Sequence, residues 1–205
     1  MDTFSNVLQL DAGKPLKGLW AKDFFKNTNP VVLELACGKG EYAVNLATLF
    51  PEKNFIGIDY KGNRIWRGAK TALEDGIHNV GFLRIQIETI LEYFELGEID
   101  EIWITFPDPQ PQESREKKRL TSPRFLEKYK TILKPGGAIN LKTDNDGFYS
   151  YTREKILEQN LNLHIKTEDL YHSEFVTDVL AIKTYYEKKY LKENKNINYL
   201  KFSFD

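Results

Sequence analysis

Short apolar runs alternate with longer amphipathic segments along most of the chain. Five runs of high apolar content are bounded by polar or glycine-containing stretches, as buried strands usually are. They are VVLEL (31–35), NFIGID (54–59), NVGFLRI (79–85), IDEIWITF (99–106) and AINLKT (138–143). Helical spacing follows each strand, at 41–50, at 63–76, in the short TILEYF segment, at 123–133 and at 148–160. Two further runs, LNLHIKT (161–167) and VLAIKTYYE (179–187), predict two final strands.

Strands that alternate with helices of this length predict a parallel sheet joined by right-handed crossovers. We therefore expect an α/β fold with a doubly wound, mostly parallel, seven-stranded sheet of the Rossmann-like type. Residues 1–205 would form a single domain, with 1–30 as an N-terminal extension and 31–205 as the core of sheet and helices. Ligands of such folds bind beyond the carboxyl ends of the strands. The segments that matter most are therefore Ala36–Gly40, Asp59 and Phe106–Pro109.

Composition narrows the class of protein. The net charge of −1 means that any binding of nucleic acid would need local basic patches. A single cysteine and three scattered histidines argue against a disulfide and a structural metal site. The first residues lack a basic start followed by an apolar run, and no apolar stretch approaches the roughly 20 residues of a membrane span. We expect a cytoplasmic protein without a metal or a membrane segment, either a monomer or a homodimer.

The loop after the first strand predicts an adenosyl site. Gly38 and Gly40 allow a tight turn and a close approach of a ligand to the backbone, although a turn alone would explain them. Asp59 ends the second strand, where a carboxylate accepts the hydroxyls of a ribose. Glu34 is a carboxylate in a buried strand, which indicates a cation or several donors nearby. Glu41, at the start of the next helix, would repel a pyrophosphate, so S-adenosylmethionine fits better than a dinucleotide.

Several other side chains have two interpretations. Gln86 follows the third strand and either reads an adenine edge or faces solvent as a loop residue. Trp66 and Trp103 are expected in the core. Tyr185 and Tyr186 could stack on a base, but packing within a strand is favoured. Cys37 is expected to be a small packing residue.

The motifs ELACGKGEYAVNLA, TFPDP, LKTD after KPGG and the late TYYE occur together and in order. From about Val31 to Glu187, the chain thus resembles the bacterial tRNA (guanine-N7)-methyltransferases. The resemblance implies a class I methyltransferase fold, S-adenosylmethionine as cofactor and tRNA as partner. It also implies methylation of guanine N7 at position 46, in the variable loop.

The resemblance also implies roles for individual residues. The implied contacts to S-adenosylmethionine, together with the glycine loop, are Glu34, Gly38, Gly40, Asp59, Gln86 and Asp108. The implied substrate contacts are Asp144, Thr184 and Glu187, with Gln112 at a position where the family usually has lysine. Gln110 likewise stands where the family usually has tryptophan.

Asp108 is the candidate catalytic residue. It lies between Pro107 and Pro109, which restrict the backbone and so fix the carboxylate in place. Guanine N7 is a lone-pair nucleophile, so no general base is needed, but a carboxylate can stabilise positive charge on the base. Asp108, Asp144 or Glu187 could also accept the N1 and N2 protons of guanine. A plain turn is the alternative for Asp108, and capping of the next helix, shared with Asp146, is the alternative for Asp144.

Three clusters of basic residues lie near these motifs, and each alone is typical of a solvated face. They comprise Lys61, Arg64, Arg67 and Lys70; then Arg115, Lys117, Lys118 and Arg119; and finally Lys183, Lys188, Lys189 and Lys192. Together they favour contacts to tRNA phosphates. Two other functions stay open: a methyltransferase of the same fold with a small-molecule or protein substrate, and a non-catalytic tRNA-binding relative.

Overall fold

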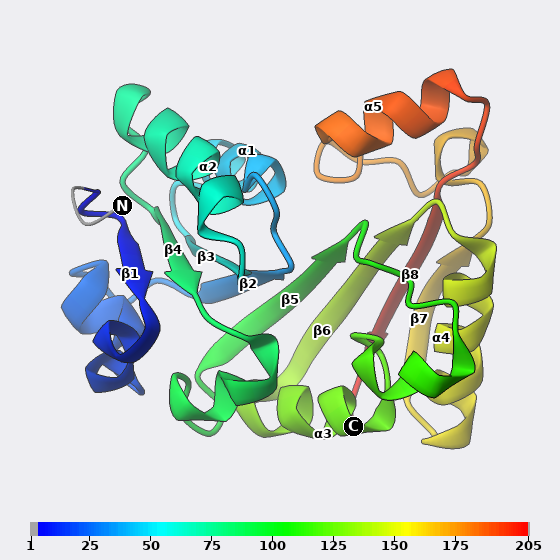
Figure 1. Ribbon diagram of the computed structural model, residues 1–205, viewed down its shortest axis with the longest axis horizontal. Helices are drawn as coiled ribbons and strands as arrows, with labels where there is room; N and C mark the ends of the chain where they lie inside the picture. The colour runs from blue at the N-terminus through cyan, green and yellow to red at the C-terminus, as the bar shows by residue number, and fades with distance from the viewer. Residues whose placement is uncertain (1–3, 205) are drawn as a thin grey trace.

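An eight-stranded sheet forms the centre of the computed structural model, which describes residues 4–204 (Figure 1). The strand order is β1-β4-β3-β2-β5-β6-β8-β7. The strands are β1 (Val7–Gln9), β2 (Val31–Leu35), β3 (Asn54–Asp59), β4 (Val80–Arg84), β5 (Ile99–Thr105), β6 (Leu133–Thr143), β7 (Asn162–Thr167) and β8 (Asn198–Ser203). Strands β1 to β6 pair in parallel, whereas β8 is antiparallel to both of its neighbours. The predicted doubly wound, mostly parallel α/β fold is therefore confirmed.

Helices cover both faces of the sheet. The longer helices are α1 (Glu41–Leu49), α2 (Gly62–Glu74), α3 (Pro123–Ile132), α4 (Asp146–Glu158) and α5 (Tyr185–Lys192). The short helical turns are Leu10–Leu16, Trp20–Phe24, Ile87–Glu92, Glu113–Lys118 and Leu170–His172. Side chains of a strand alternate between faces, so Leu33 joins the core under α3 and α4, while Val32 joins the core under α1 and α2. Glu34 therefore lies on the α1 face.

The structure has one strand more than predicted, at the edge of the sheet. Val7–Gln9 lies within the expected N-terminal extension and pairs in parallel with β4. The side-chain amide of Asn6 also donates to the carbonyl oxygen of Ala69 in α2 at 3.0 Å. Residues 7–9 are thus an integral part of the sheet.

The predicted strand at 179–187 is wrong. This segment is a loop that runs into α5, and the last strand of the sheet is Asn198–Ser203. The T-x-x-E spacing of Thr184 and Glu187 is a helix-capping box: the Thr184 hydroxyl accepts from the Glu187 amide, and the Glu187 carboxylate accepts from the Thr184 amide. This local pairing begins a helix.

Helix α5 stands apart from the other helices, beyond the carboxyl ends of β5 and β6 (Figure 1). Its position leaves Tyr185 and Tyr186 with 54% and 43% of their surface exposed, so packing of these rings within a strand is also wrong. Trp103 is buried as predicted, but Trp66 is 41% exposed on α2.

Candidate active site

A cavity of about 450 Å³ opens at the carboxyl ends of β2, β3 and β4. Its walls combine polar and apolar side chains, among them Asp59, Gln86, Ile85, Ile87 and Phe125. The strand order reverses between β2 and β5, so this is the edge at which doubly wound sheets bind ligands.

The glycine loop leaves its backbone open toward ligands. Gly38 has a φ of +56°, and nothing lies within 4 Å of the place where a Cβ atom would stand. Gly40 has a φ of +67°, and a Cβ there would strike the ring of Phe82. The first glycine thus provides open space, and the second permits close packing of the loop against β4.

Asp59 is oriented by two backbone amides. Its Oδ2 accepts from the Gly38 amide at 2.9 Å, and its Oδ1 accepts from the Lys61 amide at 2.8 Å. The side chain is largely buried, yet it lines the cavity. Each carboxylate oxygen keeps a lone pair for a further donor, so the group can accept a pair of adjacent hydroxyls.

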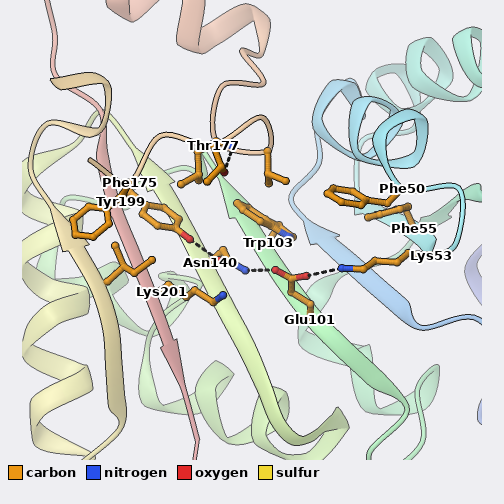
Figure 2. A pocket seen from close by; sticks show the side chains of 13 residues that line it. Phe50, Lys53, Phe55, Glu101, Trp103, Asn140, Phe175, Thr177, Tyr199 and Lys201 are labelled. Atoms are coloured by element: carbon orange, nitrogen blue, oxygen red, sulfur yellow. Dashed lines mark hydrogen bonds and ion pairs between the residues drawn. The ribbon is translucent and has the colours of Figure 1, made fainter. Parts of the chain in front are cut away.

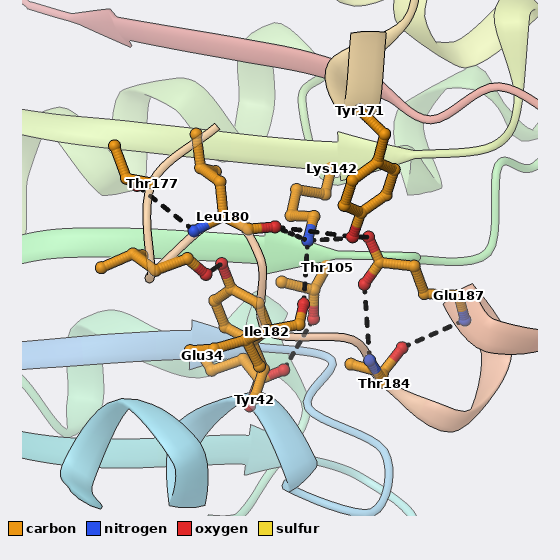
Figure 3. Close-up of polar contacts among 11 residues, drawn as sticks. Glu34, Tyr42, Thr105, Lys142, Tyr171, Thr177, Leu180, Ile182, Thr184 and Glu187 are labelled. Atoms are coloured by element: carbon orange, nitrogen blue, oxygen red, sulfur yellow. Dashed lines mark hydrogen bonds and ion pairs between the residues drawn. The ribbon is translucent and has the colours of Figure 1, made fainter. Parts of the chain in front are cut away.

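Glu34 lies beneath the glycine loop, on the α1 face of β2 (Figure 3). Its Oε1 accepts from the Thr105 hydroxyl at 2.6 Å, and its Oε2 accepts from the Ala43 amide at 2.9 Å. Burial raises the pKa of this carboxyl group from 4.5 to about 7, against the opposing effect of the two hydrogen bonds. The protein itself supplies the donors that this buried carboxylate requires.

Gln86 directly precedes the turn Ile87–Glu92, and this exposed residue lines the cavity. Its backbone carbonyl accepts from both the amide and the hydroxyl of Thr89, which fixes the backbone at the rim. Both interpretations of its side chain therefore remain compatible with its position.

Asp108 stands at a sharp corner after β5. Phe106 and Gln110 have φ angles of +49° and +46°, and the Asp108 carboxylate accepts from the Gln110 amide at 3.0 Å. The guanidinium of Arg119 donates to the Gln110 carbonyl at 3.1 Å and lies 4.4 Å from the centre of the Tyr151 ring. Asp108 therefore does form a turn, and the residue is exposed.

Asp144 is paired with a lysine from the connection between α5 and β8. The Lys195 ammonium lies 3.1 Å from Asp144 Oδ2. The alternative interpretation, that Asp144 or Asp146 caps α4, is wrong: Asn145 caps this helix, because its Oδ1 accepts from the Phe148 amide at 2.8 Å. Asp146 instead accepts from the side-chain amide of Asn198 at 2.9 Å.

Glu187 is enclosed by the fold (Figure 3). Its Oε1 lies 2.8 Å from the Lys142 ammonium and accepts from the Tyr171 hydroxyl at 2.6 Å. Its Oε2 accepts from the Thr184 amide. Thr184 is buried as well, so the structure gives both residues a structural role and brings neither carboxylate oxygen of Glu187 to the surface.

A protein-family model described as "Putative methyltransferase" matches residues 28–200. The tRNA (guanine-N(7)-)-methyltransferase of Bacteroides thetaiotaomicron is 51% identical over 187 residues, which cover 91% of this chain and 73% of the relative. The enzyme of the same name from Christiangramia forsetii is 48% identical, over 98% of this chain and 93% of the relative. The chain belongs to the tRNA (guanine-N(7)-)-methyltransferase family.

Solved structures of other methyltransferases share the fold of this family member. The 16S rRNA methyltransferase KamB superposes with a TM-score of 0.65 at 14% identity, over 86% of this chain and 88% of that chain. A SAM-dependent methyltransferase from Aquifex aeolicus gives a TM-score of 0.59 at 15% identity, over 86% and 82% of the two chains. At these identities the likeness concerns the fold alone.

The basic clusters of this family member lie on separate elements. Arg64 and Arg67 are exposed on α2 beside Trp66, and the Lys70 ammonium lies 5.2 Å from the centre of the Trp66 ring. Three residues of the second cluster lie on the exposed turn Glu113–Lys118, and half-buried Arg119 directly follows it. Gln112 precedes the turn and is exposed.

A second cavity, of about 290 Å³, lies on the α1 face of the sheet below the loop that leads to α5 (Figure 2). Asn140 connects its polar groups: the amide nitrogen donates to Glu101 at 2.7 Å, and the amide oxygen accepts from the Tyr199 hydroxyl at 2.7 Å. The predicted site residues lie elsewhere.

Within residues 4–204, no group of three or more His, Cys, Asp or Glu side chains could hold a metal ion. In the same range, no helix is long and apolar enough to cross a membrane.

Proposed function

We propose that this protein methylates N7 of guanine in tRNA, at position 46 in the variable loop, with S-adenosylmethionine as methyl donor. The observation that carries the proposal is the cavity lined by Asp59, in a chain 51% identical to a tRNA (guanine-N(7)-)-methyltransferase. The cytoplasm is the compartment that fits this activity.

The residues of the cavity fit an adenosyl group. The oriented Asp59 carboxylate suits the two ribose hydroxyls, and the open backbone at Gly38 leaves room beside it. The apolar side chains of Ile85, Ile87 and Phe125 suit the faces of an adenine ring, with the Gln86 amide at its edge.

The start of α1 is unsuited to a phosphate. Glu41 stands in the first turn, and its Oε2 accepts from the Tyr185 amide at 2.8 Å. A carboxylate at a helix N-terminus repels a pyrophosphate, which a nicotinamide dinucleotide would place there. A phosphate-free adenosyl ligand avoids this repulsion.

When bound, S-adenosylmethionine supplies an electrophilic methyl group on a sulfonium. The protein's task is to place guanine N7 in line with it, since N7 already carries a lone pair and loses no proton. The base becomes positively charged, and the exposed carboxylate of Asp108 stabilises that charge from the corner after β5.

The guanine edge presents the N1 and N2 protons to a carboxylate. Asp108 and Asp144 both keep carboxylate surface at the carboxyl edge, whereas Glu187 does not. To contact guanine, Asp144 would either break its ion pair with Lys195 or accept from the base while that ion pair stays intact. We therefore assign the contact with the guanine edge to Asp108 or Asp144, and a structural role to Thr184 and Glu187.

The test is nucleoside mass spectrometry of an unmodified tRNA transcript incubated with the protein and S-adenosylmethionine. A transcript with guanosine at position 46 should yield 7-methylguanosine, and a matched transcript with adenosine there should not. Asp108→Ala should remove most of the activity. Cofactor binding without any product would refute the tRNA substrate and favour a small-molecule or protein substrate.

A further inference from the structure

Four aromatic rings form a continuous row along the carboxyl edge. The ring of Phe106, at the corner after β5, lies 6.0 Å from that of Tyr190. Tyr190 stacks on Tyr186 at 6.4 Å, and Tyr186 meets Tyr185 edge-on at 5.5 Å. The row therefore begins two residues before Asp108 and continues along α5.

The far end of the row reaches the glycine loop. The ammonium of Lys39, between the two loop glycines, lies 4.4 Å from the centre of the Tyr185 ring. The row thus connects the corner that carries Asp108 with the loop that we assign to the cofactor. Anything bound along it would lie beside the place where the methyl group is transferred.

Tyr185 and Tyr186 are fixed in position and yet exposed, whereas Tyr190 is half-buried. The capping box of Thr184 and Glu187 fixes the first turn of α5, and the Tyr185 amide donates to Glu41. The exposed fractions of 54% and 43% show that the rings of Tyr185 and Tyr186 are not needed to fill a core. Large aromatic rings held rigidly in water are typical of binding surfaces.

Lysines surround the row. The Lys195 ammonium lies 4.6 Å from the centre of the Tyr190 ring, in addition to its ion pair with Asp144. The other basic residues of α5 and its approach are exposed: Lys183, Lys188, Lys189 and Lys192. Such a surface complements a ligand that has both flat rings and negative charge. A nucleic acid has both.

We propose that the row of Phe106, Tyr190, Tyr186 and Tyr185 is a stacking platform for unpaired nucleotides next to the target guanine. This inference rests on the proposed tRNA substrate and specifies the state in which it binds. Bases in a helix hide their faces from side chains, whereas splayed-out bases stack on tyrosine rings. The nearby lysines would hold the phosphates between those bases.

The test compares three forms of the full-length protein. The wild type is measured beside a Tyr185→Leu/Tyr186→Leu variant, which lacks the two exposed rings, and a Tyr185→Phe/Tyr186→Phe variant, which keeps them. Lys130→Ala, on the exposed surface of α3, is the control for changes elsewhere on the surface. The probe is an unmodified tRNA transcript with 2-aminopurine next to guanosine 46, and its fluorescence reports stacking directly.

The Leu variant should lose most of the fluorescence change and raise the KM for tRNA about ten-fold, since one stacked base accounts for roughly that factor. The Phe variant and Lys130→Ala should stay within about two-fold of the wild type, and the affinity for S-adenosylhomocysteine should not change in any of them. If the Leu variant fails to fold, Tyr185→Leu alone provides the same comparison.

If the Leu variant shows the same fluorescence change and the same KM for tRNA as the wild type, the stacking platform is overturned. Formation of 7-methylguanosine by the wild type would in that case leave the proposed function intact. Absence of 7-methylguanosine, with a tyrosine-dependent fluorescence change still present, would refute the proposed function and support the platform. A wild type without any fluorescence change refutes the platform.

Discussion

The ammonium of Lys142 lies 2.8 Å from the carboxylate of Glu187, and neither side chain exposes any surface. The same ammonium donates to the carbonyl oxygens of Leu180 and Ile182 at 3.0 and 3.1 Å. Burial lowers the pKa of Lys142, and the Glu187 carboxylate opposes that shift. A single cation on β6 thus holds the loop before α5 and the first turn of α5 in place (Figure 3).

Glu187→Leu should destabilise the protein by about 3–5 kcal/mol, because it leaves the Lys142 charge buried without its partner. Urea unfolding followed by circular dichroism measures the change. Replacement of both residues, Lys142→Met with Glu187→Leu, should cost less than the sum of the two single changes, since no uncompensated charge remains. Strict additivity of the single changes would show that the pair has no energetic coupling.

Glu34 should make stability depend on pH. In the folded protein the Glu34 carboxyl group keeps its proton up to about pH 7, whereas in the unfolded chain the same group releases its proton near pH 4.5. Between these values the folded state binds more protons, so the free energy of unfolding falls as pH rises and levels off above pH 7. The effect is of order 3 kcal/mol.

Glu34→Gln tests this dependence, since glutamine has no proton to release. Urea unfolding at a series of pH values between 4 and 8 should show a flatter profile for Glu34→Gln than for the wild type. Thr105→Val removes the hydroxyl that donates to Glu34 and should raise the pKa of the carboxyl group further, so the decline in stability should continue to higher pH than in the wild type. Identical slopes in the wild type and Glu34→Gln would contradict the raised pKa.

Gly68 permits α2 to pack directly against the glycine loop. A Cβ atom there would stand 2.5 Å from the carbonyl oxygen of Lys39 and 3.1 Å from the Cα of Gly40. Alanine normally favours a helix over glycine by about 1 kcal/mol, but here the overlap is with backbone that cannot move aside. We expect Gly68→Ala to cost about 1–3 kcal/mol and to weaken binding of S-adenosylhomocysteine.

Thermal unfolding and calorimetric titration measure the two effects of Gly68→Ala. Asn63→Ala is the matched control, because Asn63 is exposed on the same helix and should change stability by less than about 0.5 kcal/mol. If Gly68→Ala bound S-adenosylhomocysteine as well as the wild type, the contact between α2 and the loop would have no part in the cofactor site.

The parallel core could be predicted because each of its strands is an apolar run buried on both faces. β2 is an example: all five residues of Val31–Leu35 are buried. The position of Asp59 at a strand end followed directly from this pattern. The edge strand Val7–Gln9 could not be found in the same way, since three residues with one fully buried side chain give no periodicity.

The region before β8 was predicted wrongly because the segment 179–187 combines apolar residues with a T-x-x-E sequence. Its alternation favours a strand, but the capping box of Thr184 and Glu187 favours a helix, and the helix prevails. The partner of Glu187 could not be predicted from local pattern, because Lys142 lies far away in the sequence and its position suggested an ordinary strand residue. The sequence could therefore indicate the edge of the sheet at which the cavity beside Asp59 opens, but not the way in which Lys142 holds α5.

Arg64 and Arg67 on α2 allow a test of whether this helix contacts tRNA phosphates. Both are exposed, neighbouring turns bring them to one side of the helix, and Trp66 is exposed between them. If each neutralises a phosphate, Arg64→Ala and Arg67→Ala should each weaken tRNA binding and reduce the slope of log K against log salt by about 1. Filter binding between roughly 50 and 200 mM salt measures both quantities. Lys130→Ala removes a charge from α3 on the far surface and should leave the slope unchanged. A loss of affinity without any change of slope would mean that the two arginines act through packing and not through phosphate contacts.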